Sequence, residues 1–361
     1  MTVPQVQRVS DQRIDKVVPL MSPALLHHEL PLTDELSGTV LSGRRQVAGV
    51  LDATDDRLLV VVGPCSVHDP AAAAEYADRL AEQAARLAGD LLVVMRVYFE
   101  KPRSTVGWKG LINDPALDGS GDVSTGLRVA RALLLEVVRR GLPVGVEFLD
   151  PITPQYIADT VAWGAIGART VESQVHRQLS SGLSMPIGMK NRPDGSIGTA
   201  IDAIRAAAVP HVFPGIDFSG TPAIMHTRGN ADCHLVLRGG DGRPNYSASD
   251  VADALALLRK AGLPERLIVD CSHGNSGKDH RRQPLVADDI AQQLEAGRRG
   301  ISGVMLESFL LPGRQDLTPT AELTYGQSVT DACMGWDTTV QVLERLATAA
   351  AARRTRAPLP V

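Results

Sequence analysis

The sequence contains few aromatic residues and few cysteines. Phe, Trp and Tyr make up 4% of the chain, whereas hydrophobic residues make up 44%. This composition suits helices packed on a parallel sheet better than a sandwich of aromatic-rich strands, so it indicates an α/β protein. The four cysteines, at positions 65, 233, 271 and 333, are widely spaced. They are typical of buried thiols or metal ligands in a reducing compartment and argue against a disulfide framework.

An excess of positive charge and a long apolar run are also missing. The net charge is −4 and the pI is about 6.1, which argues against nucleic acid as the main partner. No stretch reaches membrane-spanning length, and the charged N-terminal segment lacks the apolar core of a signal peptide. We therefore expect a cytoplasmic protein without a membrane partner. The 361 residues can form one large domain or two ordinary ones.

A basic segment at residues 94–110 interrupts the apolar pattern. Residues 91–97 are long enough for a buried strand, and Pro102 ends it because proline cannot donate to a ladder. Arg96 lies inside this strand and Lys101 at its mouth, and two cations at one strand end suit an anionic ligand. A solvated basic loop is the alternative, although such loops seldom alternate with aromatic residues as this one does.

Strand patterns and helix patterns alternate along the chain after residue 56. Short apolar runs separated by helical stretches predict parallel strands with right-handed crossovers. Eight such units predict a (β/α)8 TIM barrel. The helical stretches include 154–163 and, at the end, 327–354. The predicted strands are 57–62, 91–98, 144–149, 165–170, 185–190, 234–238, 267–271 and 301–307.

Two segments fall outside the repeating pattern. Residues 1–45 form an N-terminal extension, an arm that either covers the barrel floor or reaches a neighbouring subunit or a regulatory site. Residues 46–361 form the catalytic barrel, with an extra β-hairpin insertion at about 210–232 between the fifth and sixth units. A ninth strand of the barrel sheet is the alternative for that insertion.

Polar residues gather at the predicted carboxyl ends of the strands, where a barrel carries its active site. Unpaired buried cations are costly, so inward-pointing cations require a ligand with several negative charges. Phosphate is the natural candidate, and the absence of a GxxxxGK[ST] or GxGxxG motif favours a small phosphorylated acid over a nucleotide. The cations are Arg96, Lys101, Arg169, Lys190 and Arg238.

A second set of strand-end residues has the chemistry of metal ligands. A thiolate, an imidazole and two carboxylates, from Cys65, His273, Glu307 and Asp331, suit Mn, Fe, Co or Zn with room for substrate. Other interpretations stay open from spacing alone. Cys65 alone is more often a small buried residue, His273 could be structural or a base, and the carboxylates could pair with arginines. Cys271, two residues before His273, is a rival ligand.

Taken together, the motifs from about residue 56 to the C-terminus closely resemble the class I 3-deoxy-D-arabino-heptulosonate 7-phosphate (DAHP) synthases. The resemblance preserves the order of the motifs and is far more specific than a lone glycine motif. The motifs are GPCSVHDP (63–70), VMRVYFEKPRSTVGWKGLINDP (94–115), EFLD (147–150), GNADCHLVLRGG (229–240), DCSHGNSGKDH (270–280), GVMLES (303–308) and SVTDACMGW (328–336).

The resemblance implies a metal-dependent transferase that condenses phosphoenolpyruvate with D-erythrose 4-phosphate, releases phosphate and opens the shikimate pathway of aromatic amino acid biosynthesis. It assigns the divalent metal, Mn²⁺ in the first place with Fe²⁺, Co²⁺ or Zn²⁺ as alternatives, to Cys65, His273, Glu307 and Asp331. It assigns phosphoenolpyruvate to Arg96, Lys101, Ala168, Arg169, Lys190 and Arg238. It assigns the binding of erythrose 4-phosphate to Lys101, Pro102, Arg103, Ser104 and Asp331. The catalytic candidates are Lys101, Glu147, Lys190 and His273.

Departures from the family pattern keep other functions open. Residues 215–218 and 310–316 differ from the usual loops, which argues against feedback control by Phe, Tyr or Trp and favours testing other acceptors. One alternative is a paralogue that uses another aldose phosphate in a secondary pathway, and another is a non-catalytic regulatory barrel. The arm makes a homodimer or homotetramer the expected assembly.

Overall fold

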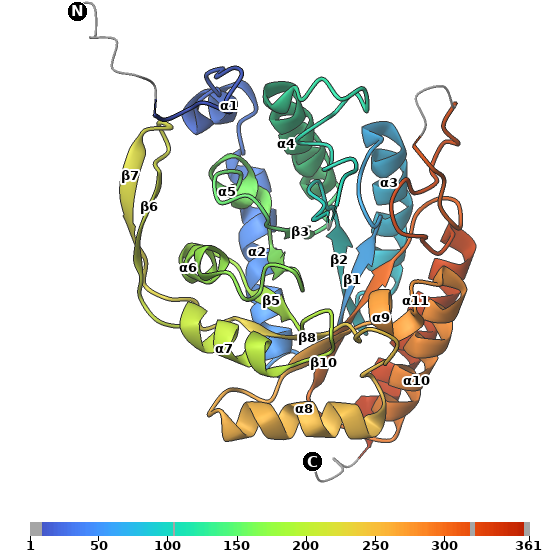
Figure 1. The fold of residues 1–361 in the computed structure, drawn as a ribbon. Helices are drawn as coiled ribbons and strands as arrows, with labels where there is room; N and C mark the ends of the chain where they lie inside the picture. Colours follow the sequence, from blue (N-terminus) through green and yellow to red (C-terminus); the bar gives the residue numbers. More distant parts are fainter. Residues whose placement is uncertain (1–8, 104, 318–321, 357–361) are drawn as a thin grey trace, which may run out of the picture.

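The computed structural model describes residues 9–103, 105–317 and 322–356, and eight parallel strands in it close into a barrel (Figure 1). Around the barrel the strands follow their order in the chain, with the last strand paired to the first. The (β/α)8 fold expected from the sequence is therefore confirmed. The strands are β1 (Leu58–Gly63), β2 (Leu91–Arg96), β3 (Val144–Glu147), β4 (Trp163–Ile166), β5 (Ile187–Lys190), β8 (His234–Leu237), β9 (Leu267–Asp270) and β10 (Ile301–Glu307).

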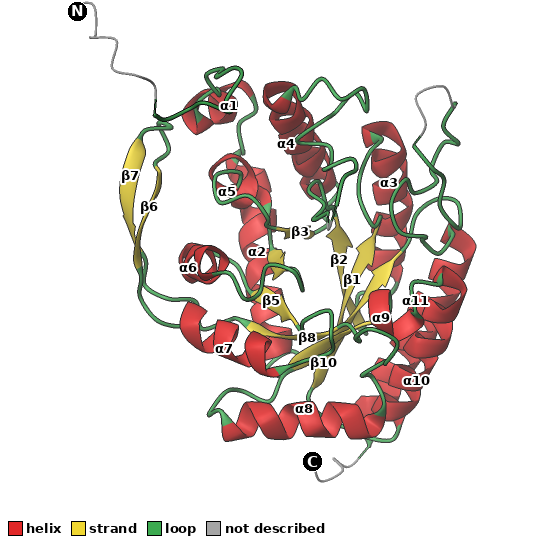
Figure 2. Cartoon of the chain, viewed as in Figure 1, coloured by secondary structure: helices red, strands yellow, loops and turns green. Residues whose placement is uncertain are grey.

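Helices surround the strands on the outside of the barrel (Figure 2). Local sequence fixes where several begin: the Asp69 carboxylate accepts the backbone N–H of Ala71, and Ser247 forms a capping box with Asp250. Within the described ranges, no helix is both long and apolar enough to cross a membrane. The outer helices are α3 (Pro70–Arg86), α4 (Val123–Arg139), α5 (Pro154–Ile157), α6 (Gln174–Gly182), α7 (Gly198–Ala207), α8 (Ala248–Lys260), α10 (Gln283–Glu295) and α11 (Trp336–Thr355), with a short α9 (His273–Ser276) after β9.

The N-terminal segment closes the floor of the barrel. It contains α1 (Pro23–Glu29) and α2 (Asp34–Leu51), and α2 runs through residue 45, where the sequence places the boundary between arm and barrel. The side chains of Val47, Val50 and Leu51 join the apolar cluster inside the barrel. The interior is thereby sealed at the end where the strands begin, so ligands can reach it from the other end.

Some predicted boundaries are wrong. The helix predicted at 154–163 ends in a 3-10 turn at Thr160, and the fourth strand begins at Trp163 instead of residue 165. Trp163 belongs to the barrel interior, where its indole N–H donates to His234 Nε2 at 3.2 Å. The last helix begins at Trp336 instead of residue 327, because the preceding residues form isolated bridges with the segment that follows β10.

The insertion between the fifth and sixth barrel strands is a hairpin, as predicted. Its strands β6 (Val212–Ile216) and β7 (Pro222–His226) pair antiparallel in a sheet of their own, so the ninth-strand alternative is wrong. The hairpin stands outside the ring of helices (Figure 1). Its tip touches the N-terminal segment, since the Ala24 backbone N–H donates to the Phe218 carbonyl at 2.9 Å and the His27 ring stacks edge-on against Phe218.

Candidate active site

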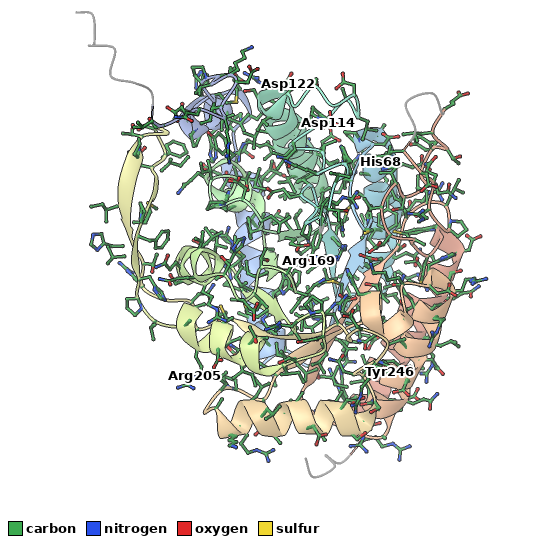
Figure 3. The ribbon with its side chains drawn as sticks, viewed as in Figure 1. His68, Asp114, Asp122, Arg169, Arg205 and Tyr246 are labelled. Carbon is green, nitrogen blue, oxygen red and sulfur yellow. The ribbon has the colours of Figure 1, made fainter. Side chains whose placement is uncertain are left out.

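A polar cavity of about 110 Å³ lies at the carboxyl end of the barrel strands. Figure 3 shows Arg169 near the centre of the molecule, beside this end of the strands. The loop after β2, the ends of β3 and β5, and the loops after β4, β8, β9 and β10 all contribute side chains. The lining residues are Lys101, Pro102, Arg103, Glu147, Gly167, Ala168, Arg169, Lys190, Arg238, His273, Lys278, Thr330 and Asp331.

Three of the predicted residues, Cys65, Arg96 and Glu307, are buried and do not line this cavity. Arg96 and Glu307, 0% and 2% exposed, form an ion pair with Arg96 Nη2 2.9 Å from Glu307 Oε1. Arg96 also donates to the carbonyls of Pro64 and Cys65, both at 3.0 Å, and its guanidinium lies over the Tyr98 ring. Glu307 therefore neutralises the Arg96 cation in a place where an unpaired charge would cost several kcal/mol, about 3–5.

The predicted metal ligands come together at the base of the cavity. Ligand atoms of Cys65, Glu307 and Asp331 all lie within 4.8 Å of one another. His273 lies at the edge of this group, with Nε2 3.6 Å from Glu307 Oε1. One thiol and two carboxylates around one point, with an imidazole at their edge, fit a divalent transition metal, because together they supply a soft ligand and hard anionic oxygens.

The electrostatics of these ligands respond to the surrounding cations. Burial, followed by the charge of Glu307, raises the pKa of the Cys65 thiol. The Lys101 ammonium nevertheless lies 3.1 Å from Cys65 Sγ, where it favours the thiolate. Burial opposes ionisation of Asp331, but the charges of Lys101, His273 and Lys278 outweigh it and lower the pKa of Asp331.

Asp270 at the end of β9 and Ser272 orient His273, which is the first residue of α9. Its backbone has φ of +50°, a left-handed conformation that is costly for a residue with a side chain. His273 Nδ1 lies 2.9 Å from Asp270 Oδ2 and 2.8 Å from Ser272 Oγ. Both contacts lie on the Nδ1 side of the ring, so they hold the imidazole with Nε2 facing Glu307.

Asp270 also holds Lys190. Lys190 Nζ lies 3.0 Å from Asp270 Oδ2, and the two side chains are 4% and 0% exposed. Burial favours the neutral acid, but His273 and Lys190 outweigh this effect and keep the pKa of Asp270 well below its usual range. Asp270 is therefore ionised and fixes one cavity-lining cation and one metal-ligand candidate at once.

Two further contacts shape the cavity wall. Arg238 is 9% exposed, and its buried Nε has no hydrogen-bond partner among the described residues, whereas Nη1 donates to the Gly239 carbonyl at 3.2 Å. Glu147 Oε1 lies so close to Gly167 that a Cβ built on the glycine would be 2.1 Å away. A larger residue at position 167 would therefore require the Glu147 carboxylate to move away from this part of the wall.

Sequence reasoning located most of this lining but missed Gly167, Lys278 and Thr330, although Lys278 lies in the DCSHGNSGKDH motif. It also gave no role to Asp270, which does not line the cavity but pairs with Lys190. Lys278 Nζ lies 4.0 Å from Asp331 Oδ1. Because Lys278 is a cation within a motif that also supplies His273, the motif could have suggested it as a site residue. Ser104, predicted to bind the aldose phosphate, lies outside the described residues.

The fold and this cavity define the class of protein: a (β/α)8-barrel enzyme whose strand ends carry an anion-binding cavity next to a cluster of metal-ligand candidates. Comparison with known proteins narrows the class. The model of the DAHP synthetase I family matches residues 35–344. The chain belongs to this family.

Individual relatives agree over nearly the whole length. The Phe-sensitive phospho-2-dehydro-3-deoxyheptonate aldolase of Escherichia coli strain K12 is 53% identical over 344 residues, which cover 95% of this chain and 98% of the relative. The phospho-2-dehydro-3-deoxyheptonate aldolase of Corynebacterium glutamicum is 52% identical over 355 residues and 96% of each chain. The solved structure of the Francisella tularensis SCHU S4 aldolase superposes with a TM-score of 0.92 at 50% identity, covering 94% of this chain and 99% of that one.

Proposed function

We propose that this chain catalyses the aldol-type condensation of phosphoenolpyruvate with D-erythrose 4-phosphate, which yields 3-deoxy-D-arabino-heptulosonate 7-phosphate and inorganic phosphate. The observation that carries the proposal is the cavity at the strand ends, where lysines and arginines face two carboxylates beside a set of metal-ligand candidates. Family membership and relatives at about half identity over nearly the full length support it.

Phosphoenolpyruvate requires several cations, because it carries a carboxylate and a phosphate. We assign its anionic groups to Arg169, Lys190 and Arg238, with the Ala168 backbone N–H as a further donor. The unpartnered Nε of Arg238 is a donor that a phosphate or carboxylate oxygen would satisfy. Lys101 completes the set at the cavity wall, together with Arg96, which is buried in an ion pair with Glu307.

The acceptor sugar phosphate belongs to the loop after β2. Lys101, Pro102 and Arg103 line the cavity there, and Ser104 follows them in the chain. Asp331 faces the same space and suits a sugar hydroxyl. Lys278, whose Nζ lies 4.0 Å from Asp331 Oδ1, adds a half-exposed cation that we assign to the acceptor phosphate as well.

We propose that Cys65, His273, Glu307 and Asp331 hold a divalent metal ion, with Mn²⁺ preferred and Fe²⁺, Co²⁺ or Zn²⁺ as alternatives. Such an ion, when bound, acts as a Lewis acid that polarises the acceptor aldehyde. The chain's own contribution is to present these ligands from the ends of β1, β9 and β10 and from the segment that follows β10. Asp270 orients the His273 ring, and Lys101 stabilises the Cys65 thiolate at 3.1 Å.

We assign proton transfer to titratable side chains that line the cavity. Carbon 3 of phosphoenolpyruvate attacks the aldehyde carbon, and water then adds to carbon 2 before the phosphate leaves with C–O cleavage. Glu147, 7% exposed at the cavity wall, is placed to accept a proton from that water, and Lys190 to donate or hold one. Lys101 is the candidate that polarises or protonates the aldehyde oxygen, with His273 beside it.

A paralogous synthase with another aldose phosphate is the second candidate function. The unusual segment after β10 at residues 310–316 favours it, because it follows Glu307 directly. Product analysis with erythrose 4-phosphate and with other aldose phosphates separates the two. A non-catalytic regulatory barrel would instead release no phosphate with any acceptor and any divalent metal.

Regulation and assembly stay predictions for this chain. A cavity of about 730 Å³ lies between α5, α6 and the β6–β7 hairpin, and Gly215 and Phe218 of the altered hairpin line it. We expect activity that is insensitive to Phe, Tyr and Trp, which rate measurements with each amino acid test. Val9, Val17 and Val18 of the N-terminal segment are exposed, which supports a homodimer or homotetramer, to be tested by light scattering. A cytoplasmic location also stays a prediction.

The function is tested by phosphate release and product identification. Protein supplied with phosphoenolpyruvate, erythrose 4-phosphate and Mn²⁺ is expected to release phosphate and form the seven-carbon product together. Phosphate release without that product would reject the proposed acceptor. No release from folded protein would reject the synthase.

A further inference from the structure

A second cavity lies at the end of the barrel opposite to the candidate active site. It has a volume of about 270 Å³ and lies where strands begin: Arg57 directly precedes β1, Arg266 precedes β9, and Ile301 is the first residue of β10. The last turn of α11 borders it with Arg353. We call it the floor cavity. The described residues that line it include none of those assigned above to substrate or metal.

Arginine dominates the lining of the floor cavity. Carboxylates neutralise three of these side chains. Arg57 Nη2 lies 2.5 Å from Asp55 Oδ2, Arg266 pairs with Asp52, and Arg354 pairs with Asp56 at 3.0 Å and with Asp90 at 2.7 Å. The Glu265 carboxylate is already engaged by Arg259 outside the cavity. The arginines that line it are Arg57, Arg266, Arg299, Arg353 and Arg354.

The two remaining cations have no carboxylate partner among the described residues. Arg353 is 8% exposed and donates only to backbone carbonyls, of Ile301 and Asp56 at 3.0 Å and of Arg57 at 3.3 Å. Carbonyls satisfy N–H groups but neutralise no net charge. Burial, together with the charges of Arg299 and Arg354, lowers the pKa of Arg353, and the charge of Asp56 offsets only part of this effect. Arg299 itself is exposed at the cavity rim and makes no ion pair with a described carboxylate.

A buried N–H donor of Arg266 also lacks a partner. Arg266 is 6% exposed, and its buried Nε has no hydrogen-bond partner in the described chain. The α11 helix ends at Thr355, so its negative dipole end lies near Arg353, but a helix terminus supplies only about half a charge. The five arginines of the floor cavity meet four paired carboxylates, Asp52, Asp55, Asp56 and Asp90, so one positive charge is left without a carboxylate.

We propose that the floor cavity binds a phosphate-type oxyanion, held by Arg353 and Arg299. Guanidinium groups present paired N–H donors that match the oxygens of a phosphate. The anion would remove the repulsion between the two arginines and compensate the buried charge of Arg353. A volume of 270 Å³ is several times the roughly 30 Å³ of a water molecule, so a phosphate monoester fits as well as inorganic phosphate.

The direct test locates the anion. Crystals of the full chain are soaked in sodium tungstate, a heavy tetrahedral oxyanion, and anomalous density is measured. We expect a peak within hydrogen-bond distance of the Arg353 and Arg299 guanidinium groups, besides any peak at the strand-end cavity. A peak confined to the strand-end cavity would overturn the proposal.

A binding experiment in solution uses a matched pair of variants. Arg299→Gln removes the exposed cation of the floor cavity, whereas Arg298→Gln makes the same change at the neighbouring residue, which does not line it. Calorimetric titration with inorganic phosphate should resolve a component that is about tenfold weaker in Arg299→Gln and unchanged in Arg298→Gln. Identical titrations for both variants and the wild type would contradict the proposal.

The source of the oxyanion is distinguished by a second titrant. Glycerol 3-phosphate that competes for the Arg299-dependent component assigns the cavity to phosphate monoesters, and failure to compete assigns it to the free ion. Turnover with saturating substrates should be the same in Arg299→Gln as in the wild type. A loss of turnover equal to the loss of phosphate binding would mean that the titration reports the active centre, and would overturn the proposal.

Discussion

Lys190 and Asp270 form a buried ion pair across the mouth of the barrel, with Lys190 Nζ 3.0 Å from Asp270 Oδ2. The lysine ends β5 and the carboxylate ends β9, so two separate strands fix their relative position. The same Asp270 oxygen lies 2.9 Å from His273 Nδ1. One carboxylate thus joins the anion-binding side of the cavity to the metal-ligand side.

Replacing this carboxylate by an amide tests its positioning role. In Asp270→Asn the amide cannot neutralise Lys190 and no longer fixes the proton on His273 Nδ1. We expect metal affinity and turnover to fall about 10- to 100-fold while the fold is retained. Chelator competition measures the metal affinity separately from activity. If turnover falls while the metal affinity is unchanged, Asp270 acts through Lys190 alone and not through His273.

Removing the thiol tests the metal assignment. Cys65→Ala deletes the one soft ligand of the set, so bound divalent metal and turnover should both be lost, with the circular dichroism spectrum unchanged. Cys233→Ala is the matched control, because Cys233 is also a buried free cysteine but lies outside the ligand cluster. Full activity of Cys65→Ala in the presence of excess EDTA would rule out the assignment.

Lys278 should affect one substrate and leave the other unchanged. Lys278→Gln removes a half-exposed cation at the cavity entrance, so we expect the KM for erythrose 4-phosphate to rise about tenfold and the KM for phosphoenolpyruvate to stay the same. Lys260→Gln, at the end of α8 and away from the cavity, is the control. A rise in the KM for phosphoenolpyruvate instead would move Lys278 to the other substrate.

The buried Glu100 carboxyl should make the stability of the fold depend on pH. Burial and the charge of Asp150 raise its pKa from 4.5 to about 8, although Thr153 donates to it at 3.1 Å. The folded state therefore binds this proton more tightly than the unfolded chain. The stabilisation of the folded state by this proton is complete below pH 4.5 and is lost as the pH rises through about 8. The free energy of unfolding should fall by about a few kcal/mol over this range.

The variant Glu100→Gln cannot lose that proton. Its free energy of unfolding, measured in urea between pH 6 and pH 9, should improve relative to the wild type as the pH rises. The exposed Glu136→Gln serves as the control. A difference between Glu100→Gln and the wild type that does not change with pH would mean that Glu100 is ionised throughout this range.

The sequence predicted the barrel well because its signals are local and repeated. Each strand is a short apolar run before a polar loop, and the carboxyl ends of parallel strands must share one end of the barrel. The start of the last helix at Trp336 was missed because the residues before it form bridges with the segment after β10. The strand boundary at Trp163 was missed for another tertiary reason. An indole can belong to a helix face or to a barrel interior, and only the contact of Trp163 with His234 decides between them.

The sequence predicted which residues belong to the candidate site, but not which of them line the cavity and which are buried beneath it. Charge and motif placed Arg169, Lys190 and Arg238 at strand ends, and the structure brings them to one cavity. That Arg96 lies beneath this cavity, paired with Glu307, depends on side-chain packing that no spacing reveals. The substrate and metal roles of individual residues stay predictions that the variants above are designed to test.

The most direct test of the central claim follows phosphate release and product formation in one reaction. The purified chain is supplied with phosphoenolpyruvate and erythrose 4-phosphate, first with Mn²⁺ and then with excess EDTA. The account predicts equal amounts of phosphate and 3-deoxy-D-arabino-heptulosonate 7-phosphate with Mn²⁺, and neither product with EDTA. Equal rates with and without EDTA would contradict the metal assignment, and no product from folded protein with any divalent metal would contradict the function itself.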